Sequence, residues 1–256
     1  MNTSTPHPIN AAKKKMLQGE PAIGVSCGTG SPLVAELLSH AGFDFVLVDL
    51  QHGAWTDETV AHAFRAINLG HATPMARVAA NDYGAIGRLL DRGALGIVVP
   101  MVNSSEEARA AAFAVRYPPH GGRSSGGAPP HYGAHYDQWA NDEVFLAVQI
   151  ETVQAVEQAE EILGVDGVDG CWIGPSDLAK SMGIDRGTPA GAKAHREMIM
   201  RVVAACKKTG KIAGISGDLD ITFWLQNGMQ FVTASYDGGL MLEGARQVFN
   251  IISKQS

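Results

Sequence analysis

The chain has 256 residues, of which 45% are hydrophobic and 18% are charged, and its formal net charge at pH 7 is −6. The acidic balance excludes a general nucleic-acid binder, which would carry a basic face, and the even mixture of apolar and charged residues argues against disorder. Three cysteines without a Cys-x-x-Cys pair make neither a disulfide framework nor a zinc site, and they fit a reducing compartment.

The amino-terminal segment predicts neither export nor membrane insertion. Lys13, Lys14 and Lys15 are followed by no apolar stretch, so a secretory signal is not expected. The longest uncharged apolar run, residues 93–102, is about half of what a membrane span needs. We therefore expect a cytoplasmic protein with no membrane and no nucleic-acid partner.

Eight short apolar runs alternate with helix-like segments along the chain. Because the runs are apolar throughout rather than alternating, they are typical of parallel strands buried on both faces. Some of the segments between them carry helix start signals, such as Ser31 before Pro32 and Ser104 three residues before Glu107. The predicted strands are Pro21–Ser26, Phe45–Asp49, Thr73–Val78, Gly96–Val102, Val144–Ile150, Val168–Gly174, Lys211–Ser216 and Gln230–Ser235.

Eight strand–helix units in about 250 residues predict a (β/α)8 TIM barrel of the α/β class, a single domain over residues 1–256. A doubly wound open sheet is the alternative, but it usually has fewer strands, and no Gly-x-Gly-x-x-Gly follows the first strand. The sequence has no interdomain linker. Pro118–Asn141 is expected to be the one long irregular segment, and such loops are usually functional or mobile.

Reactive side chains occur where four neighbouring strands end. Barrel active sites lie at the carboxyl ends of the strands, so these side chains should converge. They are Asp49, Gln51 and His52 after strand two, Arg77 in strand three, Gln149 and Glu151 at strand five, and Gly174, Pro175, Ser176 and Asp177 after strand six.

Each of these residues has a chemical and a structural interpretation. Glu151 and Asp177 could hold a hard divalent ion, or they could be acids at helix amino termini. Arg77, in an apolar strand, needs a partner, which could be a substrate carboxylate or enolate or the Asp49 carboxylate. His52 could be a general base or a bystander.

Other signals point away from alternative chemistries. None of the nine lysines is placed at a strand end, which disfavours a Schiff-base mechanism. Gly28-Thr29-Gly30 resembles a phosphate cradle but lacks the continuation of one, so we expect a plain turn. His120, His131 and His135 are interpreted as polar loop residues rather than a metal-binding tract.

The stretches FDFVLVDLQHG, RYPPHGGR, VQIET and GVDGCWIGPSDLAKSMG resemble the HpcH/HpaI family of class II pyruvate aldolases. The resemblance implies a barrel that holds a divalent cation (Mg²⁺, Mn²⁺ or Co²⁺) and binds pyruvate. The implied reaction cleaves 4-hydroxy-2-oxoacids into pyruvate, or a related 2-oxoacid, and an aldehyde. A CoA-ester lyase of the citrate lyase β type and a non-catalytic keto-acid-binding barrel are the alternatives.

The resemblance also implies roles for individual residues. Glu151 and Asp177 match the metal ligands, and Gln149, Ser176 and Asp177 match the substrate contacts. Arg77 matches a residue that stabilises the transition state and contacts substrate, His52 the base, and Asp91 an acid that raises the basicity of that base. Asp49 is a further acid of the site, with Gly174 and Pro175 in support. Gln51 departs from the family, which usually has glutamate before the histidine.

The last helix is expected to form a subunit interface. Family members assemble through it, and Gly238–Ile252 carries more apolar residues than one face of a monomeric helix should expose. We therefore predict a homo-oligomer, by resemblance a hexamer, that uses the helix over residues 238–254.

Overall fold

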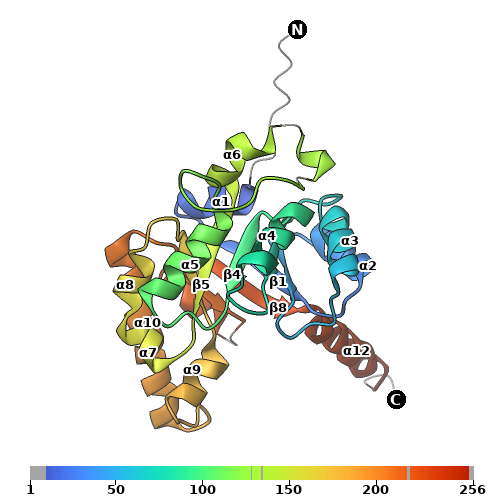
Figure 1. Cartoon of the computed structure of the whole chain (residues 1–256). Coiled ribbons are helices and arrows are strands. Elements are labelled where there is room, and N and C mark those ends of the chain that lie inside the picture. Colours follow the sequence, from blue (N-terminus) through green and yellow to red (C-terminus); the bar gives the residue numbers. More distant parts are fainter. Residues whose placement is uncertain (1–9, 128, 134, 218–219, 254–256) are drawn as a thin grey trace.

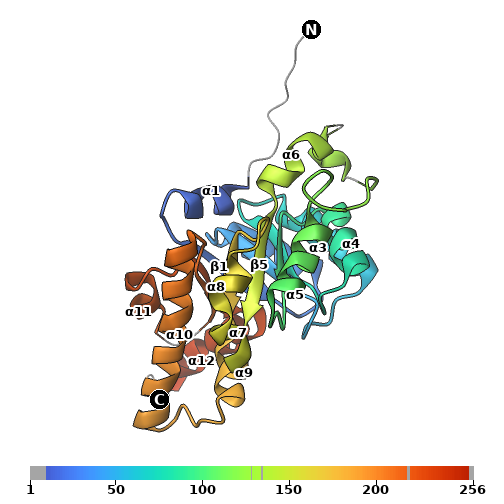
Figure 2. The same cartoon turned by 60° about the vertical axis from the view of Figure 1, so that its left-hand side comes forward.

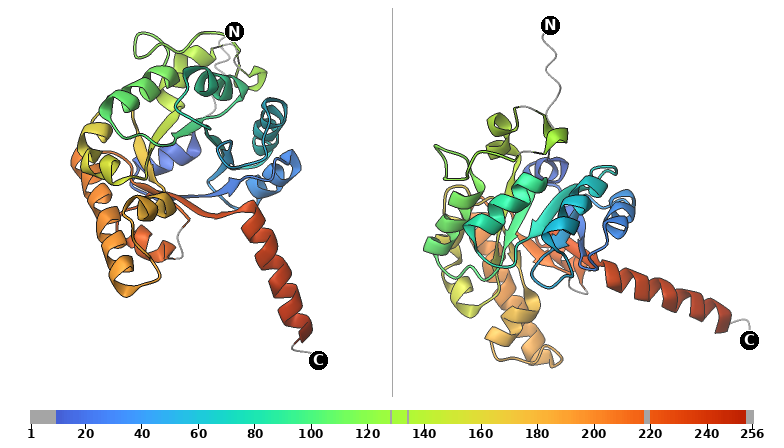
Figure 3. Two further views of the ribbon diagram at one scale, coloured as in Figure 1. Left: turned by 60° about the horizontal axis from the view of Figure 1, so that its bottom comes forward. Right: turned by 45° about the vertical axis from the view of Figure 1, so that its right-hand side comes forward.

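In the residues that the computed structural model describes (10–127, 129–133, 135–217 and 220–253), eight parallel strands close into a barrel. The strands follow chain order around the barrel, and β8 pairs with β1. All eight predicted strands are confirmed, with ends shifted by up to three residues, as is the barrel itself (Figure 3). The strands are β1 (Ala22–Cys27), β2 (Phe45–Asp49), β3 (Thr73–Arg77), β4 (Gly96–Val99), β5 (Phe145–Ile150), β6 (Gly170–Ile173), β7 (Gly214–Ser216) and β8 (Phe231–Tyr236).

Helices connect the strands and surround the barrel (Figures 1 and 2). Those between successive strands are α2 (Pro32–His40), α3 (Asp57–Ile67), α4 (Tyr83–Arg92), α5 (Ser105–Val115), α7 (Val153–Glu157) with α8 (Ala159–Leu163), α10 (Pro189–Thr209) and α11 (Ile221–Gln226). The chain adds α1 (Ala11–Leu17) before β1, a 3₁₀ turn η1 (Pro130–Tyr132) and α6 (Tyr136–Glu143) before β5, α9 (Pro175–Ser181) after β6, and α12 (Asp237–Ser253) after β8.

The helix start signals are confirmed, one of them with a difference. The Ser31 side chain caps α2 with Pro32 in its first turn, and the Ser104 hydroxyl accepts the Glu107 N–H at 3.2 Å. The Glu107 carboxylate accepts the N–H of Asn103 at 2.6 Å rather than that of Ser104. The reciprocal half of the expected capping box is therefore displaced by one residue.

The expectation that residues 118–141 are irregular is wrong at their carboxyl end, where α6 forms. Tyr136 and Trp139 of this helix are buried. The Tyr132 ring stacks on Tyr136 at 5.7 Å and meets Trp139 edge-on at 5.6 Å. Tyr136 and Trp139, three residues apart, give α6 an apolar face that packs on Tyr132 of η1. The glycine- and proline-rich residues before the helix obscured this face in the sequence.

The barrel interior is filled from its amino-terminal end. The Phe231 ring lies 4.6 Å from that of Phe45 and 5.0 Å from that of Phe145. Met16 of α1 belongs to the same buried cluster, so α1 covers this end of the barrel (Figure 1). A Cβ at Gly24 would lie 2.3 Å from the Phe45 ring, so glycine makes the room that the ring occupies. Any reaction chamber must therefore lie toward the carboxyl ends of the strands.

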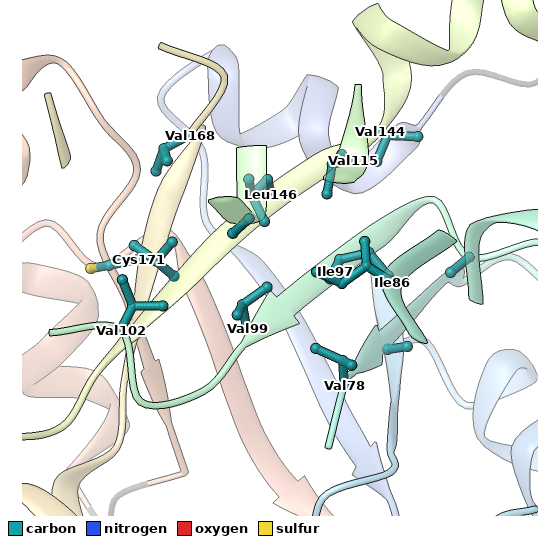
Figure 4. Packing of buried hydrophobic residues seen from close by; sticks show 14 of the residues in the cluster. Val78, Ile86, Ile97, Val99, Val102, Val115, Val144, Leu146, Val168 and Cys171 are labelled. Carbon is teal, nitrogen blue, oxygen red and sulfur yellow. The ribbon is translucent and has the colours of Figure 1, made fainter. Parts of the chain in front are cut away.

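A second core lies between the strands and the surrounding helices. Ile86 of α4 packs near Val78 and Ile97, and Val115 of α5 lies by Leu146 (Figure 4). Aliphatic side chains on the outer face of each strand meet the inner face of the next helix. This packing explains why the predicted strands read as uninterrupted apolar runs.

Helix α12 departs from the pattern, because it projects away from the barrel (Figure 3). Of its described residues only Asp237 is buried. Seven large apolar side chains of the helix are at least 39% exposed: Leu240, Met241, Leu242, Val248, Phe249, Ile251 and Ile252. Among the described residues, no helix is long and apolar enough to cross a membrane.

Candidate active site

Strand alternation directs the predicted residues to the inside of the barrel. Phe45 and Leu47 of β2 point inward, and so does Asp49 two residues later. The same step of two leads from Met75 to Arg77 in β3. On β5 it leads from inward-facing Phe145 and Ala147 to Gln149 and then Glu151. The polar groups therefore form the layer above the apolar filling.

Arg77 and Asp49 form an ion pair at this level. Nε and Nη2 of Arg77 donate to the two carboxylate oxygens of Asp49 at 2.9 and 2.5 Å. Each side chain is 11% exposed, and the guanidinium lies 5.1 Å from the centre of the Trp172 ring. The predicted structural interpretation of Arg77, a salt bridge to Asp49, is confirmed. Because a guanidinium has five donors, the pair leaves donors of Arg77 for a substrate oxygen.

Asp49 also fixes the turn that carries His52. Its Oδ1 accepts the backbone N–H of Gln51 at 3.0 Å and that of His52 at 3.3 Å. A Cβ at Gly53 would lie 2.2 Å from the Asp49 carbonyl oxygen, so the turn requires glycine there. His52 is exposed at the rim, on the same turn as the buried ion pair.

Glu151 is the most enclosed carboxylate of the site, at 2% exposure. It accepts the N–H of Met101 at 2.9 Å and Nε2 of Gln149 at 2.5 Å. Burial raises the pKa of Glu151; the Met101 N–H opposes this rise and the negative charge of Asp177 adds to it. Because burial makes the negative charge of this carboxylate unfavourable, a bound cation would stabilise the charged form.

Two backbone features make room for Glu151. A Cβ at Gly174 would lie 2.7 Å from Oε2 of Glu151 and 2.9 Å from Nε2 of Gln149, so a glycine is required beside them. Met101, whose N–H binds Glu151, has φ 55°, a left-handed conformation that is uncommon outside glycine. Sequence reasoning missed Met101, since no signal in the chain marks a methionine for this conformation.

The residues after β6, the strand paired with β5, continue the wall of the site beside Glu151. Pro175 begins α9, and its carbonyl oxygen is bound by Nε2 of His195 at 2.8 Å. Asp177, in the first turn, pairs with Lys180 at 3.1 Å and is half exposed. Oγ of Ser176 accepts Nη2 of Arg186 at 3.3 Å.

The donor set fits a hard divalent cation. Glu151 follows β5, and Asp177 lies in the first turn of α9 after β6, the strand paired with β5, so the two carboxylates lie at the same end of neighbouring strands. The buried Oε1 of Gln149, a residue of the same layer, has no hydrogen-bond partner in the described part of the chain. No group of three or more His, Cys, Asp and Glu that could hold a metal occurs among the described residues. Two carboxylates would therefore leave positions for water and substrate, as Mg²⁺ and Mn²⁺ sites do.

Asp91 lies elsewhere in the subunit. It is in the last turn of α4, next to the amino end of β4, whereas His52 follows the carboxyl end of β2. Its carboxylate binds Nη2 of Arg123 at 2.8 Å. Within one chain, Asp91 and His52 are thus at opposite ends of the barrel.

The weaker sequence signals have structural explanations. Gly28 and Thr29 donate their backbone N–H groups to Oδ2 of Asp237 at 2.9 and 2.8 Å. The turn that resembled a phosphate cradle thus binds a carboxylate of the chain itself. His131 packs on Tyr132, with ring centroids 4.2 Å apart, and burial lowers its pKa.

Comparison with known proteins agrees with this geometry. Residues 24–244 match the family model of HpcH/HpaI aldolase/citrate lyase. The chain belongs to this family. It is 38% identical to a hydroxypyruvate/pyruvate aldolase of Rhizorhabdus wittichii, with 94% of this chain and 97% of the relative covered. It is 37% identical to a 4-hydroxy-2-oxo-heptane-1,7-dioate aldolase of Salmonella heidelberg, with 92% of each covered.

A solved structure extends the likeness to the whole fold. A family protein from Burkholderia cenocepacia J2315 superimposes with a TM-score of 0.87 at 31% identity, covering 95% of this chain and 99% of its own. The protein is therefore an enzyme of the lyase class, an aldolase of the HpcH/HpaI family. Neither the CoA-ester lyase nor the non-catalytic barrel is favoured, because the relatives named above are aldolases.

Proposed function

We propose that this protein is a divalent-metal-dependent aldolase that reversibly cleaves a 4-hydroxy-2-oxoacid into pyruvate, or a related 2-oxoacid, and an aldehyde. The observation that carries the proposal is the buried Glu151 carboxylate, which lies in the same inward-facing layer as the Arg77–Asp49 pair, with Asp177 in the first turn of the helix that follows the neighbouring strand β6. The names of the aldolases described above, whose substrates are 2-oxoacids, support it.

Glu151 and Asp177 would hold the cation, which we expect to be Mg²⁺, Mn²⁺ or Co²⁺. When bound, it supplies Lewis-acid polarisation of the keto oxygen. The Arg77 guanidinium, fixed by Asp49, would stabilise the negative charge that develops on the same oxygen. Gln149 and Ser176 would orient the 2-oxoacid from either side.

His52 is the proposed base. In cleavage it would remove the proton of the 4-hydroxyl group, and in condensation a proton from the methyl group of pyruvate. Gln51, directly before His52, brings no negative charge to the histidine. The carboxylate that fixes the turn of His52 is that of Asp49, which accepts the His52 N–H.

Deuterium exchange into pyruvate, followed by NMR, tests the proposal without any aldehyde. His52→Ala should slow both exchange and aldol cleavage by about 10²–10⁴-fold, the usual contribution of a general base. His62→Ala, an exposed histidine on α3, is the matched control. Exchange at the wild-type rate in His52→Ala would place the base elsewhere.

Metal removal is the second test. Exhaustive chelation should abolish cleavage, and Mn²⁺, Mg²⁺ or Co²⁺ should restore it. Full activity after chelation would contradict the proposal. So would borohydride trapping of a pyruvate–lysine adduct, for which Lys180 beside Asp177 is the nearest candidate.

We further propose that the chain assembles through α12, as a hexamer by family resemblance. The projecting helix and its apolar side chains support this, because a monomer would leave them in water. Asp91 could act on His52 only across such an assembly, given their positions within one chain. Sedimentation of a stable 27.0 kDa monomer at micromolar concentration would contradict the assembly.

A further inference from the structure

A cavity opens directly beside Ser176. Its volume is about 420 Å³, and it lies between α9, the beginning of α10 and α11. The residues of its wall that matter here are Ser176, Arg186, Arg196 and Trp224. We call this cavity the arginine pocket.

Arg186 lines the pocket with an exposed side chain. Its Nη2 donates to Oγ of Ser176 at 3.3 Å. Within the described part of the chain, no carboxylate lies within ion-pair distance of its guanidinium. Most of its donors therefore remain free for a ligand.

Arg196 supplies a second guanidinium, and its orientation is fixed by an aromatic ring. It lies 4.0 Å from the centre of the Phe223 ring. Its Nη2 meets Asp220 at 3.4 Å, a contact in which both side chains are about half exposed. Such a pair is weak, so Asp220 can yield to a stronger anion.

Trp224 adds a third observation. The residue is 3% exposed, and its buried Nε1–H has no hydrogen-bond partner among the residues that the structure describes. Buried donors are normally paired, because an unpaired one costs free energy. The groups of the wall that call for acceptor oxygens are therefore the two guanidinium groups, whereas the Trp224 Nε1–H is enclosed beside them.

The pocket lies next to the mouth of the barrel. It shares Gly217 with a neighbouring cavity of about 390 Å³ that is lined by Ser26, Ser216 and Ser235 near the carboxyl ends of β1, β7 and β8. Because Ser176 itself lines the arginine pocket, a substrate held at Ser176 can extend into it.

We propose that the arginine pocket binds an anionic end group on the aldehyde part of the substrate: a carboxylate, phosphate or sulfonate. The inference rests on the proposed function, in which Ser176 contacts the 2-oxoacid. Planar guanidinium groups bind such oxyanions in a bidentate manner, and two of them make the pocket selective for charged over neutral aldehydes.

Condensation of pyruvate with matched aldehydes tests this. The probes are succinic semialdehyde, glyceraldehyde 3-phosphate and neutral butanal, each assayed for kcat/KM. Arg186→Gln and Arg196→Gln should each lower kcat/KM for the anionic aldehydes by about 10–100-fold more than for butanal, the scale of a lost charged contact. The end group that the pocket prefers is identified by the aldehyde, carboxylate or phosphate, whose kcat/KM falls more in these variants.

Two further variants sharpen the result. Arg201→Gln changes an arginine of the same helix that does not line the pocket, and it should affect no aldehyde selectively. Asp220→Asn removes the competing carboxylate while an asparagine can still cap α11. It should lower KM for the anionic aldehydes a few-fold.

Two outcomes would overturn the proposal. One is an equal loss for charged and neutral aldehydes in Arg186→Gln. The other is a rise in KM for pyruvate itself, which would assign Arg186 to the 2-oxoacid. Failure of wild-type protein to exchange deuterium into pyruvate would instead reject the proposed function, so the two failures are distinguishable.

Discussion

Two arginine–aspartate pairs, Arg77–Asp49 and Arg123–Asp91, lie in different parts of this barrel and differ in what surrounds the arginine. Arg77 and Asp49 sit inside the barrel at the level of Glu151, each 11% exposed. Arg123 and Asp91 lie outside it, between α4 and the segment before α6. The Arg123 side chain is 1% exposed and is enclosed by the rings of Tyr117 and Tyr136, whose centres are 4.5 and 5.1 Å away.

The surroundings separate the two roles. Arg123 donates to the Tyr136 hydroxyl at 3.0 Å and to Asp91 at 2.8 Å, and the rings cover its remaining surface. It anchors a loop-rich segment that has little aliphatic core of its own. Arg77 has one ring, that of Trp172, and otherwise faces the layer of Gln149 and Glu151. Arg77, which keeps donors beyond its bidentate pair and lies in the same inward-facing layer as Glu151, is the better candidate for chemistry.

Arg77→Lys should give the largest effect. It keeps the charge but loses the fork that fits both Asp49 and a substrate oxygen, so kcat should fall by about 10²–10³-fold, the scale of removing one oxyanion donor. Steady-state kinetics should show less change in KM for pyruvate. Arg88→Lys, on exposed α4 surface, is the control. Near-normal turnover in Arg77→Ala would reduce Arg77 to a partner of Asp49.

Arg123→Met should lower the free energy of unfolding by about 2–3 kcal/mol. Breaking a buried pair costs more than this when the remaining charge is fully enclosed, but the Asp91 side chain is 34% exposed. Urea unfolding at a fixed protein concentration measures the change. Arg109→Met removes an exposed pair with Glu106 and should cost under about 1 kcal/mol. Equal losses of unfolding free energy in Arg123→Met and Arg109→Met would show that the buried pair stabilises the fold no more than the exposed one.

Asp91→Asn tests whether the outer pair also serves the site. We expect a loss of about 1–2 kcal/mol in stability, because Arg123 loses a charged acceptor. We also expect slower pyruvate exchange, by less than in His52→Ala, if the assembly brings Asp91 to a neighbouring His52. Unchanged exchange per folded molecule would leave Asp91 as the partner of Arg123 alone.

The smallest expected effect concerns acid stability at Asp237. Burial opposes its charge, but the N–H groups of Thr29 and Gly238 outweigh burial and lower its pKa. A carboxyl with a lowered folded pKa stabilises the fold above its unfolded pKa, about 3.9, and this stabilisation is lost as the pH falls toward the folded pKa. Asp237→Asn should therefore flatten the loss of stability on acidification. An unchanged pH profile would contradict this.

Much of the site could be predicted because strand ends are local features. Arg77 interrupts an apolar run, and Glu151 and Asp177 follow two others, so barrel topology alone brings them to one end. The Met101 amide, the cradle at Gly174 and the arginine pocket could not be predicted, because each depends on contacts between loops from different strands. Helix α6 was missed because its partner Tyr132 lies in a loop-like stretch.

The sequence by itself determined the eight strands, their parallel order and the side chains at their carboxyl ends, since apolar runs and alternation are set by neighbouring residues. Tertiary structure alone decided which arginine is enclosed by aromatic rings and which faces polar space. It also placed Asp91 far from His52 within one subunit and Arg186 beside Ser176. Burial and charge depend on residues distant in the chain, and the closing of the barrel brings those residues together.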